Sequence, residues 1–573
     1  MAKKATRQKL KKSIPVGLGT ALPGTGNLGA TPEHVDAFRL FKKGAQSHRR
    51  GDYRGAAKLL LKGLKLDKDN VYGTKLLADA LANMGRRSLA IQTYEHALQF
   101  APDDMEIHFG LGNLALAMRM YDVAARFFAI YTKHCPEDPI GYNNLATAWR
   151  TQEKFDEAIA LLQQVLPLHP ESSELWNTLA ATVYDRDGLD AAIPFYEEAL
   201  RLNPDSVMTL NNLGKCMEQK GDFERGVELS RRALKTNRRF TEPRMVLAMC
   251  LMTLGELTEG WENYSERFNP SRADVTLYTH GLPEWRGEDI SDKTLLVCPE
   301  QGLGDEIFFA TNFGDVIKQA GKCLIGCDKR LVPLFARSFP EATFGPYVDH
   351  RIDAHRCRTL PFAEADDVRH ADLAIPAGDL MKFFRPTVES FPERAGYLTP
   401  DPERVAYWKA RLDDLGPGPK VGICWRSGMR SADRNRYYTS LDQWGPIFDV
   451  PSVHFVSLQY DDCKAELDAA RAKHGVEIHM PDGIDLKNNL DDAAALTAAL
   501  DLVLSAPTSV GMTAIGVGTE LWSLMRMLPF WSFGGKDRSP LHAKSRIFVW
   551  PEGSGWTEVI EKVGAELKKL AAT

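Results

Sequence analysis

Small apolar positions recur along the first half of the chain with a period of 34 residues. One series of small residues occupies Gly44, Ala78, Gly112, Ala146, Ala180, Gly214 and Ala248. A second series at the same step occupies Ala56, Ala90, Ala124, Ala158, Ala192, Gly226 and Gly260, and four units end at Pro102, Pro136, Pro170 and Pro204. Small residues let paired antiparallel helices cross closely, and a proline ends the second helix. The spacing therefore predicts seven helical hairpins over residues 37–274.

This spacing resembles the tetratricopeptide repeat family, which implies a helical superhelix whose first helices line a concave groove. Asparagines stand at the fifth position of three successive units, at Asn143, Asn177 and Asn211. An amide both donates and accepts hydrogen bonds, so a ladder of asparagines can hold the backbone of an extended acceptor peptide. The ladder is similar to the one in the repeat domain of the O-linked N-acetylglucosamine transferases. The alternative is that these asparagines only solvate the groove.

After the repeats, the pattern changes to continuous apolar runs that alternate with helical stretches. The runs predicted as buried parallel strands are 294–298, 323–327, 420–425, 453–459, 476–480, 501–505 and 520–525. Helices fit between most of them, notably at 490–500 and 508–517. This alternation predicts two doubly wound α/β halves. The expected boundaries are a connector at 275–292, a first half at 293–395, a hinge at 396–419 and a second half at 420–573.

Four segments of this second part carry a family resemblance. They are Glu-Gln-Gly-Leu-Gly-Asp at 300–305, Trp-Arg-Ser-Gly at 425–428, Ser-Leu-Gln at 457–459 and the block 501–522. In this order they look like the glycosyltransferase domain that follows tetratricopeptide repeats in many bacterial proteins. That domain is similar to the heptosyltransferases, which have the GT-B fold. The resemblance implies an α-helical tetratricopeptide superhelix followed by an α/β GT-B domain of two Rossmann-like halves, the second of which binds a nucleotide-sugar donor. It implies no cofactor and no metal ion.

Glycines and an aspartate after the first predicted strand are the main catalytic candidates. Gln301, Gly302 and Gly304 stand between a strand and a helix, where glycines allow a tight turn and close approach of the donor to backbone N–H groups. In heptosyltransferases the aspartate of the matching Gly-Asp pair is regarded as the general base. The resemblance therefore implies that Asp305 accepts the proton of a Ser or Thr hydroxyl as its oxygen attacks the anomeric carbon. The alternative is a carboxylate that stabilises the helix dipole.

A candidate anion site lies where a later strand leads into a helix, at Pro507, Thr508 and Ser509. Free N–H groups and two hydroxyls there suit the phosphate of the donor, although plain N-capping explains the same residues. Heptosyltransferases have Asp-Thr followed by His where this chain has Pro507-Thr508 and Met512. The donor therefore does not follow from the heptose enzymes.

Other donor-binding candidates stand at the ends of two predicted strands. Arg426, with the nearby Arg430, Arg434 and Arg436, could neutralise a phosphate or a sugar carboxylate, unless these arginines form a solvated loop. Gln459 could contact the base or the ribose of the nucleotide.

Composition and charge narrow the function classes. A net charge of -5 and a pI of about 6.3 do not indicate a nucleic-acid-binding protein, which usually carries an excess of basic residues. No apolar run approaches the ~18 residues of a membrane span, and the N-terminus lacks an apolar signal-peptide core, so we expect a cytoplasmic protein without stable membrane insertion. Nine cysteines without a CxxC pair are expected to be core thiols. The basic, Gly- and Pro-rich residues 1–36 predict a disordered tail or a weak electrostatic tether.

These features predict a protein O-glycosyltransferase whose repeats hold a protein acceptor. The resemblance extends to bacterial enzymes that modify flagellin with nonulosonic acids. It implies flagellin as the acceptor and a CMP-activated pseudaminic or sialic-like acid as the nucleotide sugar. Two alternatives stay open. One is a non-catalytic tetratricopeptide adaptor with a degenerate transferase domain, which Pro507 and Met512 favour. The other is a heptosyltransferase-like enzyme of lipopolysaccharide synthesis.

Overall fold

A computed structural model describes residues 32–270, 272, 275–352, 355–364, 371–429, 437–550 and 555–572. The chain divides into two compact units, Met1–Thr182 and Val183–Thr573. Residues 1–31 of the predicted tail lie outside the described residues. The last five residues of that tail are helical, because α1 (Pro32–Arg49) begins at Pro32.

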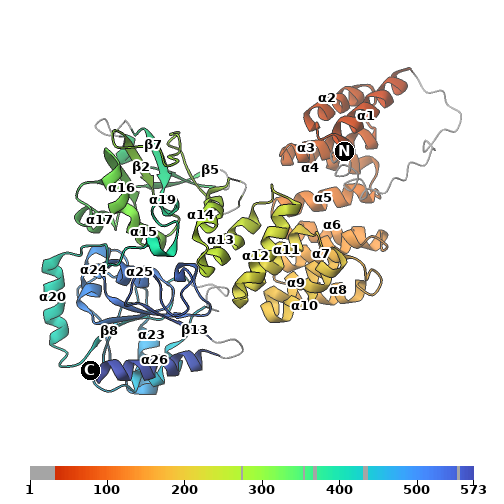
Figure 1. Cartoon of the computed structure of the whole chain (residues 1–573). Coiled ribbons are helices and arrows are strands. Elements are labelled where there is room, and N and C mark those ends of the chain that lie inside the picture. The colour runs from red at the N-terminus through yellow and green to blue at the C-terminus, as the bar shows by residue number, and fades with distance from the viewer. Residues whose placement is uncertain are drawn as a thin grey trace. The chain divides into compact units, whose positions relative to one another are not determined.

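The first unit consists of helical hairpins (Figure 1). Its helices are α1, α2 (Tyr53–Leu66), α3 (Val71–Asn83), α4 (Arg87–Phe100), α5 (Met105–Ala117), α6 (Tyr121–His134), α7 (Pro139–Thr151), α8 (Phe155–Val165) and the first part of α9 (Ser173–Asp187). The small residues stand where the helices cross. A Cβ added to Gly112 would lie 2.7 Å from the Phe128 ring, so this crossing requires glycine.

The helical hairpins continue into the second unit. They comprise the end of α9, α10 (Leu189–Leu202), α11 (Val207–Lys220), α12 (Phe223–Thr236), α13 (Glu242–Leu254) and α14 (Leu257–Tyr264). The predicted array of helical hairpins is thus confirmed. The final hairpin packs directly against the α/β part of the second unit, because Trp261 of α14 contacts Phe309 and Phe533 and shares their core.

Two parallel sheets come after the array in the second unit (Figure 1). One has the order β4-β3-β2-β7, formed by β2 (Thr294–Cys298), β3 (Lys322–Cys327), β4 (Thr343–Pro346) and β7 (Leu373–Pro376). The other has the order β10-β9-β8-β11-β12-β13, formed by β8 (Lys420–Cys424), β9 (His454–Ser457), β10 (Ile478–His479), β11 (Leu502–Ser505), β12 (Glu520–Met525) and β13 (Arg546–Val549). A small sheet joins β1 (Thr276–Tyr278), β6 (His355–Thr359) and β5 (Val348–Ile352).

Short helices connect the strands. The helical stretch after β2 is broken into α15 (Leu303–Phe309), a 3-10 turn at Ala310–Asn312 and α16 (Phe313–Gln319). The others are α17 (Val332–Ser338), α18 (Pro361–Glu364), α19 (Met381–Phe384), α20 (Pro402–Asp413), α22 (Gly445–Phe448), α23 (Lys464–His474), α24 (Leu490–Ala499), α25 (Ser509–Val517) and α26 (Trp556–Ala571). Two 3-10 turns, η2 (Ser265–Phe268) and η4 (Ala377–Leu380), flank the turn after β2.

Candidate functional site

The turn after β2 meets the first turn of α25. A Cβ added to Gly304 would lie 3.6 Å from the Ser509 Cα, which is ordinary van der Waals contact. The structure thus brings together two predicted segments that lie about 200 residues apart in sequence, at the carboxyl ends of β2 and β11. Ligands of α/β sheets bind at such ends, so the contact marks the candidate site.

A cavity of about 190 Å³ opens on one side of this contact, and we name it the Ser509 cavity. Its polar lining combines the hydroxyls of Ser509 and Thr513 with Tyr460 and the cations Arg330 and Lys487. The rest of its wall is Leu303, Ile307, Leu458, Leu486, Leu490, Ala493, Thr497 and Val510. An apolar wall with a few convergent polar groups is typical of a small-molecule site.

A second pocket, of about 170 Å³, lies beside Asp305, and we name it the Asp305 pocket. Its wall comprises Met245, Met249, Tyr264, Arg267, Arg272, Glu300, Gln301 and Asp305. Five of these residues come from the final helical hairpin and the segment directly after it. The pocket therefore joins the repeat array to the turn after β2.

A buried ion cluster of Arg267, Glu300 and Asp379 forms the floor of this region. Arg267 Nη2 lies 2.5 Å from Glu300 Oε1, and Arg267 Nη1 lies 2.6 Å from Asp379 Oδ1. The three side chains are at most 6% exposed. The Gly378 N–H also donates to Glu300 Oε1 at 2.7 Å, and Lys382 Nζ lies 3.0 Å from Asp379 Oδ2. These contacts fix η2 and η4 against the turn that carries Asp305.

The environment of Asp305 makes its carboxyl group more basic than usual. Burial, followed by the negative charge of Glu300, raises the pKa of Asp305 from 3.8 to about 6, against the opposing charge of Arg267 and a backbone hydrogen bond from Gly302. A Cβ on Gly302 would lie 3.0 Å from Asp305 Oδ2, so the glycine leaves room for the carboxylate. A carboxylate with a pKa just below neutrality is suited to general-base catalysis.

Arg358 holds the backbone of the same turn and carries no signal in the local sequence. Its guanidinium donates to the carbonyl oxygens of Glu300 and Gln301 and lies 3.9 Å above the Tyr347 ring. The Gln301 side chain donates through Nε2 to the Arg267 carbonyl at 3.1 Å. Gln301 therefore lines the Asp305 pocket, with its amide held by the backbone of η2.

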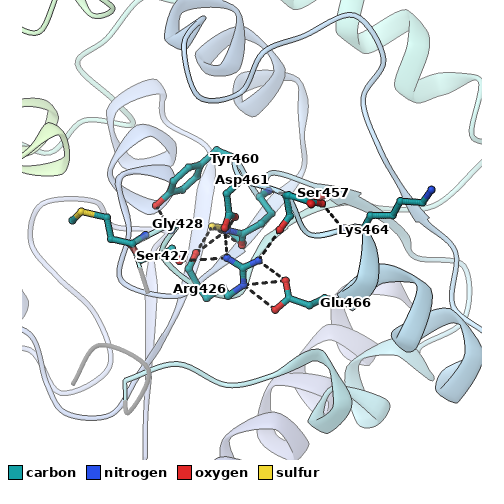
Figure 2. Close-up of polar contacts among 12 residues, drawn as sticks. Arg426, Ser427, Gly428, Ser457, Tyr460, Asp461, Lys464 and Glu466 are labelled. Carbon is teal, nitrogen blue, oxygen red and sulfur yellow. Dashed lines mark hydrogen bonds and ion pairs between the residues drawn. The ribbon is translucent and has the colours of Figure 1, made fainter. Parts of the chain in front are cut away.

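Arg426 follows β8 as expected, but its charge is neutralised within the protein by Asp461 and Glu466 (Figure 2). Its Nη1 donates to Asp461 at 2.5 Å, and its Nε donates to Glu466 at 2.9 Å. Gln459 is buried beside it and donates through Nε2 to Asp461 Oδ1 at 2.7 Å. Neither Arg426 nor Gln459 lines either cavity. Arg426, after β8, and Gln459, after β9, are thus held by hydrogen bonds within the protein. Arg430, Arg434 and Arg436 lie outside the described residues.

The start of α25 retains uncapped backbone donors. Thr508 is the N-cap residue, but its side chain makes no capping hydrogen bond and lies 3.3 Å from Ser505 Oγ instead. Ser509 lines the Ser509 cavity, whereas Pro507 is exposed. The first-turn N–H groups of this nine-residue helix are therefore free of a side-chain cap.

The asparagine ladder differs between its members. Asn143 Oδ1 accepts a hydrogen bond of 2.6 Å from Thr178, and its neighbour Asn144 donates to Asn113 at 3.1 Å. Asn143 and Asn177 are half-buried. Asn211 departs from the expected groove position, because its side chain is only 3% exposed among the residues of α11.

The remaining sequence-based expectations concern metals, membranes and thiols. All nine cysteines are free and eight are buried, which confirms the prediction of core thiols. Within the described ranges, no group of three or more His, Cys, Asp or Glu side chains is arranged to hold a metal ion. No helix in the part of the chain that the structure describes has the length and apolarity needed to cross a membrane.

Comparison with known proteins identifies the relatives of this chain. Residues 76–104, 109–173 and 177–239 match the tetratricopeptide repeat family. Solved structures similar to the array include MamA 41-end from Desulfovibrio magneticus RS-1, 20% identical over 30% of this chain and 97% of that one, with a TM-score of 0.28. Another is YrrB, described as a TPR protein with an unusual peptide-binding site, 19% identical over 33% of this chain and 96% of that one, with a TM-score of 0.25.

One relative extends over nearly the whole chain. Protein FlbA of Caulobacter vibrioides (strain ATCC 19089 / CIP 103742 / CB 15) is 35% identical over 547 residues, which cover 94% of this chain and 91% of FlbA. The match includes both the repeats and the parallel sheets. The protein is therefore a tetratricopeptide repeat protein that belongs to the same family as Protein FlbA.

Proposed function

We propose that this protein is a protein O-glycosyltransferase of the GT-B type. The observation that carries the proposal is Asp305, a half-buried carboxylate whose pKa is raised to about 6 in the first turn of α15, which borders two cavities. A transferase needs a site for each of two substrates and a base where they meet. The turn after β2 offers this arrangement.

The strand orders support the GT-B assignment. Counted along the chain, the six-stranded sheet has the order 3-2-1-4-5-6, which is that of a doubly wound nucleotide-binding fold. The four-stranded sheet has the order 3-2-1-4 and the same switch point beside its first strand. The candidate residues follow β2 in one sheet and β11 in the other, next to these switch points.

The Ser509 cavity is the proposed site of the donor nucleotide. Its hydroxyls and the uncapped N–H groups of α25 suit a phosphate, and the Lys487 cation lines the same cavity. Arg330, which also lines it, is paired with Asp328 at 2.8 Å. We infer a CMP-activated nonulosonic acid as the donor and flagellin as the acceptor, in a cytoplasmic reaction. The donor, the acceptor and the cytoplasmic location rest on the resemblance to bacterial enzymes that modify flagellin.

The proposed step is a direct substitution at the anomeric carbon. The acceptor hydroxyl oxygen forms the new C–O bond, and its proton passes to the Asp305 carboxylate. The bond between the anomeric carbon and the phosphate oxygen breaks, and its electron pair leaves with CMP. Phosphate contacts at the start of α25 would stabilise the charge on this leaving group.

The test is sugar transfer by the purified full-length protein, with CMP-pseudaminic acid and flagellin as substrates. Intact mass spectrometry reads the increment of one sugar on flagellin. D305N should abolish most of the transfer. E306Q is the matched control, because burial raises the pKa of Glu306 to about 8 and the neighbouring side chain is therefore neutral near pH 7.

Three results separate the alternatives. An increment with wild type and E306Q, lost in D305N, supports the proposal. An increment that survives in D305N leaves a transferase whose base is another group. Flagellin that binds the protein without gaining mass would favour a non-catalytic adaptor.

A further inference from the structure

The first turn of α15 presents side chains to both cavities. Leu303 and Ile307, four residues apart on one face of the helix, line the Ser509 cavity. Asp305 stands between them in sequence on a different face and lines the Asp305 pocket. The two cavities have no lining residue in common. The first turn of this helix therefore borders two substrate-sized spaces, and the candidate base lines the second of them.

We propose that the Asp305 pocket is the acceptor site, in which Met245 and Met249 of the final helical hairpin hold the hydroxyl side chain of an extended acceptor segment. This inference rests on the proposed transferase function. The hydroxyls and the helix N-terminus suited to a phosphate line the other cavity. This pocket takes its apolar wall from α13 and also holds Arg272 and the paired Arg267. A polypeptide bound by the repeats would meet this wall last.

The size and chemistry of the pocket fit one small side chain. Its volume of about 170 Å³ leaves room for a serine or threonine with its backbone but not for a folded element. Met245 and Met249 lie one helical turn apart, and both are half-buried. Methionine is unbranched and flexible, so it contacts varied neighbouring residues of an acceptor without strict shape matching. The acceptor residue must therefore reach Asp305 on a loop or an extended segment.

The wall and the base are held at a fixed separation. Trp261 Nε1 of α14 donates to the Arg385 carbonyl at 2.9 Å, and Thr258 donates to the Pro386 carbonyl at 3.0 Å. The buried ion cluster adds Arg267 of η2, which binds Glu300 directly. The final hairpin is thus bound to the segment after α19. The following η2 binds the turn after β2, so a hydroxyl seated against α13 keeps a constant distance from Asp305.

The experiment fills the pocket and measures two activities of the full-length protein. M249W should lower sugar transfer from CMP-pseudaminic acid to flagellin roughly a hundredfold, because a bulky ring displaces the acceptor side chain. Release of CMP without an acceptor, in which water takes the place of the hydroxyl, should change by less than about twofold since the donor cavity is untouched. M208W is the matched control, because Met208 is a 54% exposed methionine of α11 that lines neither cavity.

A second variant keeps the test informative if the tryptophan disturbs folding. M249A removes the apolar contact without adding bulk, and it should raise the KM for flagellin several-fold while the KM for the nucleotide sugar stays unchanged. Wild-type transfer rates in M249W, or a change in the nucleotide-sugar KM of M249A, would overturn the acceptor pocket alone. A wild-type protein that neither releases CMP nor transfers sugar would overturn the proposed function and this inference with it.

Discussion

Transfer by this protein should depend on the ionisation of one carboxyl group, that of Asp305. Burial and the charge of Glu300 raise the pKa of Asp305 to about 6, and only the ionised form can accept a proton. The charged groups around it are Arg267 and Arg272 from the region of the final hairpin and Glu300 from its own turn, with the Tyr264 phenol beside them. Activity should therefore fall as the pH decreases through this value.

The size of the effect follows from the pKa. With a pKa of about 6, the Asp305 carboxyl group is ionised in roughly nine tenths of the molecules at pH 7, in half at pH 6 and in about a tenth at pH 5. The kcat/KM for flagellin should thus fall about tenfold between the plateau and pH 5. An aspartate with the ordinary pKa of 3.8 would lose little activity over the same interval. Initial rates of sugar transfer by intact mass, in buffers of constant ionic strength, measure this profile.

Two variants of the buried ion cluster test how much the charge of Glu300 contributes to the raised pKa of Asp305. E300Q removes the negative charge that raises the pKa of Asp305, so the acidic limb should move to lower pH. D379N removes a charge from the opposite side of Arg267 and should leave the limb close to its wild-type position, at a comparable loss of stability. An acidic limb that centres near pH 4 in the wild type would refute the assignment of Asp305 as the base. A limb that stays in place in E300Q would leave burial as the cause of the raised pKa.

Three further substitutions test the framework. Gly378→Ala would place a Cβ 2.6 Å from a guanidinium nitrogen of the buried ion cluster and should lower the free energy of unfolding by ~1–3 kcal/mol in urea titrations, whereas Gly555→Ala, with open space around it, should be nearly neutral. Arg426→Gln should cost about 2 kcal/mol of stability without raising the KM for the nucleotide sugar, and a raised KM at unchanged stability would restore a donor role. Asn143→Ala loses the hydrogen bond from Thr178 and should cost ~1 kcal/mol, so an unchanged melting temperature would contradict a structural role.

The fold was predictable where its determinants are local. A 34-residue period of small residues defines the helical hairpins, because each crossing lies within one or two units. Central strands such as β2 and β8 are buried on both faces and appear as continuous apolar runs. In the two parallel sheets, the apolar runs missed β4, β7 and β13, which are four-residue segments at the sheet edges, where fewer side chains are buried. Their sequences therefore carry too short a pattern to recognise.

The candidate site was predictable only in part. Asp305 and Ser509 stand next to strand ends, so their positions follow from the local order of strand, turn and helix. The charged residues around Asp305 could not be predicted in this way, because Arg267 is 33 residues from Glu300 and 112 from Asp379 in sequence. A charged residue at a strand end also suggests a ligand contact when the residue that neutralises it within the protein lies far away in the sequence. For Arg426 the compensating carboxylates stand 35 and 40 residues further along the chain.

The final helical hairpin is packed into the α/β part of the second unit rather than forming part of a separable array. Trp261 is 1% exposed in the core that contains Phe309 and Phe533, and Arg267 neutralises two carboxylates that border the turn after β2. Removing the hairpin together with η2 would leave Glu300 and Asp379 buried without the Arg267 guanidinium, at a cost of several kcal/mol. The same segment supplies Met245, Met249 and Arg267 to the wall of the Asp305 pocket. In the proposed transferase, recognition of the acceptor and proton transfer to Asp305 would therefore depend on one packed interface.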